Sequence, residues 1–103
     1  MSWKSKDLIA SDSIMITGAE DGLATGVCVQ MNSVAASGVL TISGSNDGGT
    51  TKVALLMVPV GSATGVTSSA ANGMWRCDCS GIQQVYANMA TGTGTILWSP
   101  YRG

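Results

Sequence analysis

Three cysteines are the residues whose chemistry is simplest to name. Cys77 and Cys79 stand two positions apart, and Cys28 lies far upstream. Thiolates bind zinc, but a Cys-x-Cys pair on a strand places its sulfurs about 7 Å apart, which is too far to share one zinc without a bulge. The same spacing argues against a disulfide between Cys77 and Cys79, whereas a bond from Cys28 to either of them stays open. The sequence favours free, buried thiols that pack as small apolar side chains.

Catalytic residues are difficult to assemble from this chain, because it contains no histidine. Histidine is the commonest general base and a frequent metal ligand. The six acidic residues are scattered, and the one adjacent pair, Glu20 and Asp21, lies in a turn signal. We therefore expect a protein that is not an enzyme, with no catalytic residue, no cofactor and no metal.

The stretch SGSNDGGTTK, residues 43–52, can be interpreted either as an ion-binding site or as a turn. It lies between two apolar runs and contains a single acid, Asp47, whereas calcium takes about six to eight oxygen ligands. Asparagine, aspartate and glycine accept the positive φ angles that hairpin turns require. No helix follows whose N-terminus would bind phosphate. The stretch predicts a turn.

Five aromatic residues offer either a sugar-stacking platform or anchors for a partner protein. Trp75 lies on the cysteine face of an alternating run, so we expect it in the core. Trp98 and Tyr101 lie near one end of the chain, and Trp3 lies near the other. Large exposed aromatic side chains are typical anchors at protein interfaces, and we favour that role over sugar stacking.

An apolar contact surface is the functional site that the sequence predicts. Methionines that are not needed in the core suit an adaptable subunit contact. The N-terminal residues 1–12 are a candidate arm that reaches a neighbouring chain, with a frayed terminus as the equal alternative. The interface candidates are Trp3, Leu8, Ile9, Met15, Met31, Trp98 and Tyr101.

The composition also points to contact with other protein chains. Charged residues make up 11% of the sequence, against about 25% in ordinary domains, and the net charge is −1. A surface poor in lysine and glutamate is typical of interfaces. The charge balance provides no excess of positive charge that would bind nucleic acid, and no apolar run reaches the length of a membrane helix. We therefore expect neither nucleic acid nor a membrane as a partner.

Short runs separated by glycine-bearing turns predict an all-β fold. No window shows a helical period, and about seven or eight strands over 103 residues are typical of a single β-sandwich or jelly roll. The run 52–60 is apolar on both faces, which predicts one strand buried on both sides. We expect a sandwich domain over 13–103, a loop over 61–73 and a short tail over 99–103. The expected strands are 13–17, 25–31, 37–43, 52–60, 74–79, 83–89 and 95–98.

Two segments carry a resemblance to a known class of protein. GVLTISGSNDGGTTK, followed later by SSAANGMWRCDCSGIQQVYANMATGTGTILW, resembles small structural proteins in the virions of tailed bacteriophages, over residues 37–98. The resemblance implies a capsid decoration, or cement, protein in the virion, assembled in the bacterial host cytoplasm. It implies homo-oligomers, with a trimer favoured, that bridge the major capsid protein. The alternatives are a tail, fibre or head–tail component that binds a receptor or a neighbouring tail protein, and a carbohydrate-binding module.

Overall fold

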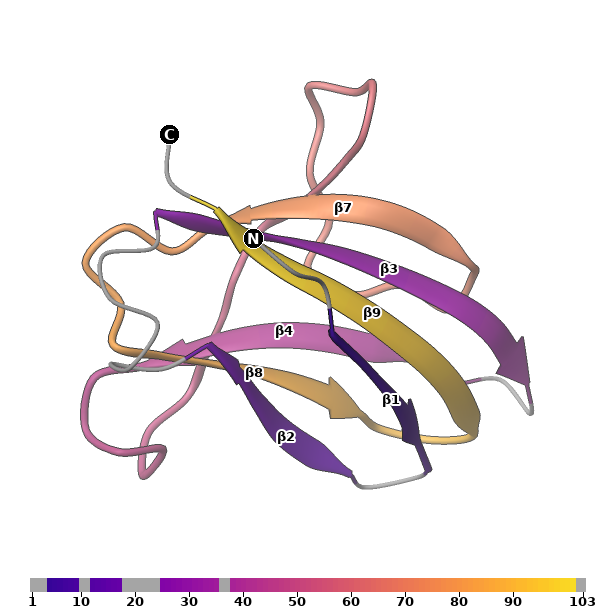
Figure 1. Cartoon of the computed structure of the whole chain (residues 1–103), viewed down its shortest axis with the longest axis horizontal. Coiled ribbons are helices and arrows are strands. Elements are labelled where there is room, and N and C mark those ends of the chain that lie inside the picture. The colour runs from indigo at the N-terminus through magenta and orange to yellow at the C-terminus, as the bar shows by residue number, and fades with distance from the viewer. Residues whose placement is uncertain (1–3, 10–11, 18–24, 36–37, 102–103) are drawn as a thin grey trace.

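The protein folds as a β-sandwich of two antiparallel sheets (Figure 1). The computed structural model describes residues 4–9, 12–17, 25–35 and 38–101, which form nine strands and no helix. The predicted all-β class is therefore confirmed. No helix in this described part of the chain is long and apolar enough to cross a membrane.

The two sheets, here sheet A and sheet B, are the upper and lower layers of Figure 1. Sheet A has the order β1 (Lys4–Leu8), β9 (Thr93–Tyr101), β3 (Gly26–Ala35), β7 (Gly73–Asp78) and β6 (Met57–Pro59). Sheet B has the order β2 (Ser13–Thr17), β8 (Gln84–Met89), β4 (Leu40–Ser45) and β5 (Val53–Ala54). Short links join β1 to β2 and β5 to β6. The edges β1 and β2 therefore share one side of the sandwich, and β5 and β6 share the opposite side.

Alternation of apolar and polar residues places the core between the sheets. Strand β7 turns Trp75 and Cys77 inward, and β8 turns Val85, Ala87 and Met89 inward, as the sequence predicts. Strand β3, which covers most of the expected strand 25–31, turns Val27, Val29 and Met31 inward, and all three side chains are fully buried. The buried apolar side chains are Leu8, Ile16, Val27, Val29, Met31, Leu40, Ile42, Met57, Trp75, Cys77, Cys79, Val85, Ala87, Met89, Ile96 and Trp98.

The prediction of one doubly buried strand over 52–60 is wrong. The run forms two short strands in different sheets, β5 in sheet B and β6 in sheet A. The chain crosses between the sheets at residues 55–56, and Leu56 is 55% exposed there. The apolar run reflects a crossing of the sandwich edge, not burial on two faces. Its end at Pro59 belongs to an edge strand, where a missing N–H is tolerated.

The predicted C-terminal tail is also wrong, because β9 continues through Tyr101. Tyr101 lies opposite Gly26 of β3, and the two strands pair along most of their length. Pro100 lies beyond the described pairing of β1, which ends where Lys4 faces Trp98.

The predicted arm over residues 1–12 contains strand β1. Lys4–Leu8 pairs antiparallel with β9 of the same chain and is the edge of sheet A. Residues 1–3 and 10–11 lie outside the described residues. Residues 4–8 are therefore part of the sandwich in the single chain.

A polar network covers the outer face of sheet B. Lys52 Nζ lies 4.2 Å from the centre of the Tyr86 ring and donates to Ser13 Oγ at 2.9 Å. Ser13 donates to Asn88, and Asn88 Nδ2 donates to Ser43 Oγ at 2.8 Å. These contacts tie β2, β8 and β4 together and explain why Ser43 is only 5% exposed on an outer face.

Candidate functional site

The stretch 43–52 forms the turn that the sequence predicts, and side chains close it. Ser45 Oγ donates to Asp47 Oδ1 at 2.7 Å, and the Thr51 amide donates to the same oxygen at 2.9 Å. Gly48 and Gly49 adopt φ angles of 77° and 94°, in the region that glycine enters at least cost. The turn is therefore fixed in shape by its own polar groups.

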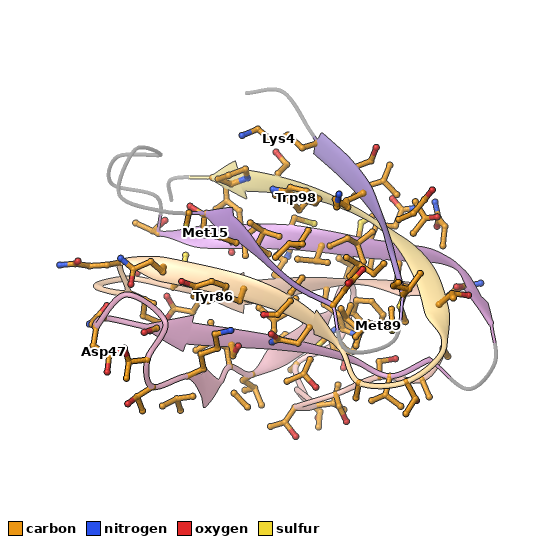
Figure 2. The ribbon with its side chains drawn as sticks, turned by 90° about the horizontal axis from the view of Figure 1, so that it is seen from below. Lys4, Met15, Asp47, Tyr86, Met89 and Trp98 are labelled. Carbon is orange, nitrogen blue, oxygen red and sulfur yellow. The ribbon has the colours of Figure 1, made fainter. Side chains whose placement is uncertain are left out.

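The Asp47 carboxylate is held in its charged form at the surface. The hydrogen bond from the Thr51 amide lowers the pKa of Asp47, and that from the Ser45 hydroxyl lowers it further. Both of these bonds end on Oδ1, and a hydrogen bond from the Thr51 side chain to the same carboxylate lowers the pKa as well. A fixed negative charge thus remains at this end of the sandwich (Figure 2).

A hollow of about 440 Å³ opens beside this turn. A Cβ at Gly44 would lie 2.9 Å from Ile82 Cγ2, so the glycine lets β4 approach the Ile82 side chain that borders the hollow. Asp47 is the one charged residue among those that line it. The lining is apolar on Gly44, Val53, Leu55 and Ile82 and polar on Ser45, Asn46, Asp47 and Thr51.

The turn between β7 and β8 is hydrogen-bonded to the rim of the hollow. Asn46 Nδ2 donates to the Gly81 carbonyl at 3.2 Å, and the Gln83 amide donates to Asn46 Oδ1 at 2.6 Å. These bonds join the turn after β4 to the turn after β7. The rim of the hollow is thereby connected to both sheets and can present its residues in a fixed arrangement.

The stretch from β5 to the start of β7 exposes apolar side chains and contains no charged residue. No charged residue occurs between Lys52 and Arg76, and the segment between β6 and β7 in this stretch projects beyond the sheets (Figure 1). The exposed fractions are 64% for Val53, 55% for Leu56, 46% for Val60, 40% for Val66 and 40% for Met74. We call these five residues the uncharged patch.

Two contacts connect members of the uncharged patch. A Cβ at Gly65 would overlap the Leu56 side chain, so Leu56 packs directly on the backbone next to Val66. The Val60 amide donates to the Met74 carbonyl at 3.0 Å. Contiguous exposed apolar side chains are typical of a protein-interaction site. The long uncharged stretch of sequence was the signal that could have identified it.

The predicted interface candidates divide between the core and the surface. Leu8, Met31 and Trp98 are 1%, 0% and 7% exposed, so in the folded chain they fill the core and are not available to a partner. Ile9 and Met15 are 61% and 47% exposed. They lie on the side of β1 and β2, away from the uncharged patch.

The remaining two candidates are the terminal aromatics. Trp3 lies outside the described residues. Tyr101 is half-buried, because its ring lies over Gly26 where a Cβ would overlap it. With Trp98 in the core and Tyr101 packed on its own sheet, these two side chains do not form an open platform for a sugar ring.

The cysteines are placed as packing residues. Burial, followed by the nearby Cys79 and Cys28, raises the pKa of the Cys77 thiol to about 12. Cys28 faces outward from β3, away from the inward-facing Cys77, and none of the three cysteines forms a disulfide. No group of three or more cysteine or acidic side chains in the described part of the chain is arranged to hold a metal ion.

These features define a small two-sheet β-sandwich with several exposed apolar side chains. No family model and no curated protein matches the sequence. The fold is similar to that of the SPBc2 prophage-derived protein YomS, with a TM-score of 0.68 and 15% identity over 95% of this chain and 93% of that chain. It is also similar to the PBSX exported protein XepA, with a TM-score of 0.71 and 16% identity over 97% of this chain. The chain spans 38% of XepA, and at these identities the likeness establishes a shared fold.

Proposed function

We propose that this protein is a structural subunit of a tailed-phage particle, most specifically a capsid decoration protein. The observation that carries the proposal is the uncharged patch, in which five large apolar side chains are exposed within a stretch of sequence that carries no charge. Exposed apolar surface of this kind marks a site for contact with another protein. The protein acts by adhesion, without catalysis and without a cofactor.

The phage assignment has two supports. The turn-and-strand segments over residues 37–98 resemble virion proteins of tailed phages. Both structural neighbours also carry phage names, one as an SPBc2 prophage-derived protein and one as a PBSX exported protein. The proposed location is the virion, and assembly takes place in the cytoplasm of the bacterial host.

The mechanism is the burial of apolar surface at joints between capsid subunits. Several copies, with a trimer favoured, sit where major capsid proteins meet and cover the joint. Burying the uncharged patch against the shell removes Leu56, Val60 and Met74 from water, which favours the closed shell over separated subunits. Neither nucleic acid nor membrane takes part.

The experiment is the addition of purified protein to phage shells that lack it, followed by sedimentation and counting of bound copies by quantitative mass spectrometry. A decoration protein saturates at hundreds of copies per shell and raises the temperature at which the shell opens. The matched variants are Leu56→Ser, in the patch, and Ile9→Ser, which is similarly exposed on the opposite side. Loss of binding with Leu56→Ser alone supports the proposal, and absence of wild-type binding refutes it.

A second function is favoured by one observation. The sandwich corresponds to 38% of XepA, which is named an exported protein, so the same fold also occurs as a module of a larger chain. A tail, fibre or head–tail component that binds a receptor or a neighbouring tail protein fits this modular use. Copy number separates the two functions, because a tail component is present in a few copies per particle and a shell protein in hundreds.

A further inference from the structure

The side of the sandwich formed by β1 and β2 presents two lysines without partners. Lys4 lies opposite Trp98 and Lys6 opposite Ile96 in the pairing with β9. Directly opposed residues share a face, so both lysines project toward the same side of sheet A as the core. Both are exposed, and neither has a hydrogen-bond or ion-pair partner among the described residues.

The opposite side of the sandwich presents a complementary site. The hollow beside the turn 46–52 is apolar on Val53, Leu55 and Ile82, and the charged group among its lining residues is the exposed Asp47 carboxylate. A lysine side chain has the matching chemistry, because an apolar stem carries a cationic head. The stem suits the apolar lining and the ammonium group suits Asp47.

We propose that the β1 edge of one copy, through Lys4 and Lys6, docks at the Asp47 hollow of a second copy. The occupant is a second copy of this chain because the chain supplies both halves of the contact on opposite sides of one rigid body. Figure 2 shows Lys4 and Asp47 well separated on the molecule. Lys52, by contrast, is already engaged with Tyr86 and Ser13 of its own chain.

The geometry of this contact determines the kind of assembly. Because the two surfaces differ and lie on opposite sides, the contact is head-to-tail, and such contacts generate a ring when the rotation closes. The uncharged patch is largely separate from the hollow, sharing Val53 with it, so the rest of the patch remains available to another protein. The inference extends the self-association in the proposed function and does not depend on the identity of the capsid partner.

The test is a charge exchange measured by sedimentation velocity on the full chain. One variant carries Lys4→Glu and Lys6→Glu, and the other carries Val53→Lys, which places a cation in the hollow without altering the Asp47 turn. Each variant alone is expected to associate about tenfold or more weakly than the wild type. An equal mixture is expected to recover association. The unaltered lysine edge of the Val53→Lys copy meets the unaltered hollow of the other copy, and at the next contact glutamate meets the lysine at position 53.

The matched control is Ala63→Lys, which introduces the same cation at an exposed position that lies outside both the hollow and the uncharged patch. It is expected to associate as the wild type does, and circular dichroism confirms that every variant is folded. A wild type that stays monomeric at about 100 μM, or variants that associate like the wild type, overturns the proposal. If the wild type binds shells but stays monomeric, the proposed self-contact is refuted and the decoration function stands. If the wild type self-associates but does not bind shells, the decoration function is refuted and the self-contact stands.

Discussion

The packing of Tyr101 on Gly26 gives a stability prediction that the sequence alone did not suggest. The two residues are opposite each other on β9 and β3, and the Tyr101 ring lies where a Cβ on residue 26 would be. Gly26→Ala therefore displaces the ring from the sheet. An aromatic side chain that covers a glycine on a neighbouring strand supports that strand pair, and the substitution removes this support.

The size of the effect follows from the area involved. A buried tyrosine covers about 150–250 Å², so a half-buried ring such as Tyr101 covers about 100 Å². At about 25 cal/mol per Å² this corresponds to about 2.5 kcal/mol, and residual burial in the unfolded chain reduces it to about 2 kcal/mol. Alanine also restricts the conformations of the unfolded chain more than glycine does, which offsets about 0.5 kcal/mol of this loss. We expect Gly26→Ala to lower the free energy of unfolding by about 1.5 kcal/mol, or the melting temperature by about 5–10 °C.

A double-mutant cycle tests this explanation. Urea unfolding, followed by tryptophan fluorescence, is measured for Gly26→Ala, Tyr101→Ala and the double variant. With the ring removed, alanine at position 26 meets nothing, so the second substitution is expected to cost nothing further. Additive losses, with a coupling free energy below about 0.5 kcal/mol, would refute the reasoning.

Three further predictions concern the core, the thiols and the turn. Met31→Ala is expected to cost about 2–5 kcal/mol because Met31 is fully buried, whereas Met15→Ala, at 47% exposure, should change the free energy of unfolding by less than about 0.5 kcal/mol in the same urea titration. Because burial raises the pKa of Cys77 to about 12, iodoacetamide at pH 8 should label it only on unfolding, while the outward-facing Cys28 labels first in peptide mass spectrometry. Asp47 has a folded pKa below its ordinary value of 3.8, so its contribution to stability is present above that pH and is lost as the pH falls through the folded pKa. Asp47→Asn, which keeps the acceptor oxygen, should therefore flatten the acid limb of a stability-versus-pH curve below about pH 4, and an unchanged limb would contradict this assignment.

The sequence predicts a strand well where one of its faces is buried and the other carries polar groups. In β7 the inward Trp75 and Cys77 alternate with Arg76 and Asp78, so both the strand and its orientation can be predicted. Strand β8 behaves in the same way. The turn between β4 and β5 is also local, because its glycines and its Asp47 hydrogen bonds all lie within ten residues.

The incorrect structural predictions concern segments whose conformation depends on contacts with distant parts of the chain. Nothing local distinguishes a doubly buried strand from a chain that crosses between two sheets, as residues 52–60 do. Strand β1 contains three charged residues in five, and only its pairing with β9 makes it a strand. Tertiary context overrides local propensity in both cases.

The misplaced interface candidates have a different cause. Both faces of this sandwich are poor in charge, so the contrast between inward and outward positions is weak. Leu8 and Trp98 were assigned from their positions near the chain ends and Met31 from its residue type, yet their registers place all three inward. For the uncharged patch, the long uncharged stretch of sequence indicates the region, but which of its side chains are exposed depends on the crossing at residues 55–56 and on the packing of Leu56 against Gly65.

The edges of the sandwich bear on what kind of assembly the chain can form. An open sheet edge pairs with other chains without limit, and proteins suppress this with charges that point inward along the edge. Lys4 and Lys6 meet that description on β1. On the opposite side the outer edge of β6 is already paired, since Met57 exchanges both backbone hydrogen bonds with Val66, and Leu40 at the start of β4 does the same with Ser69. Hydrogen bonds thus engage the backbone at Met57 and Leu40, and the edge of sheet B on that side is the two-residue strand β5. Very short edge strands limit pairing with other chains, which favours contact through side chains and assemblies of defined size over fibres.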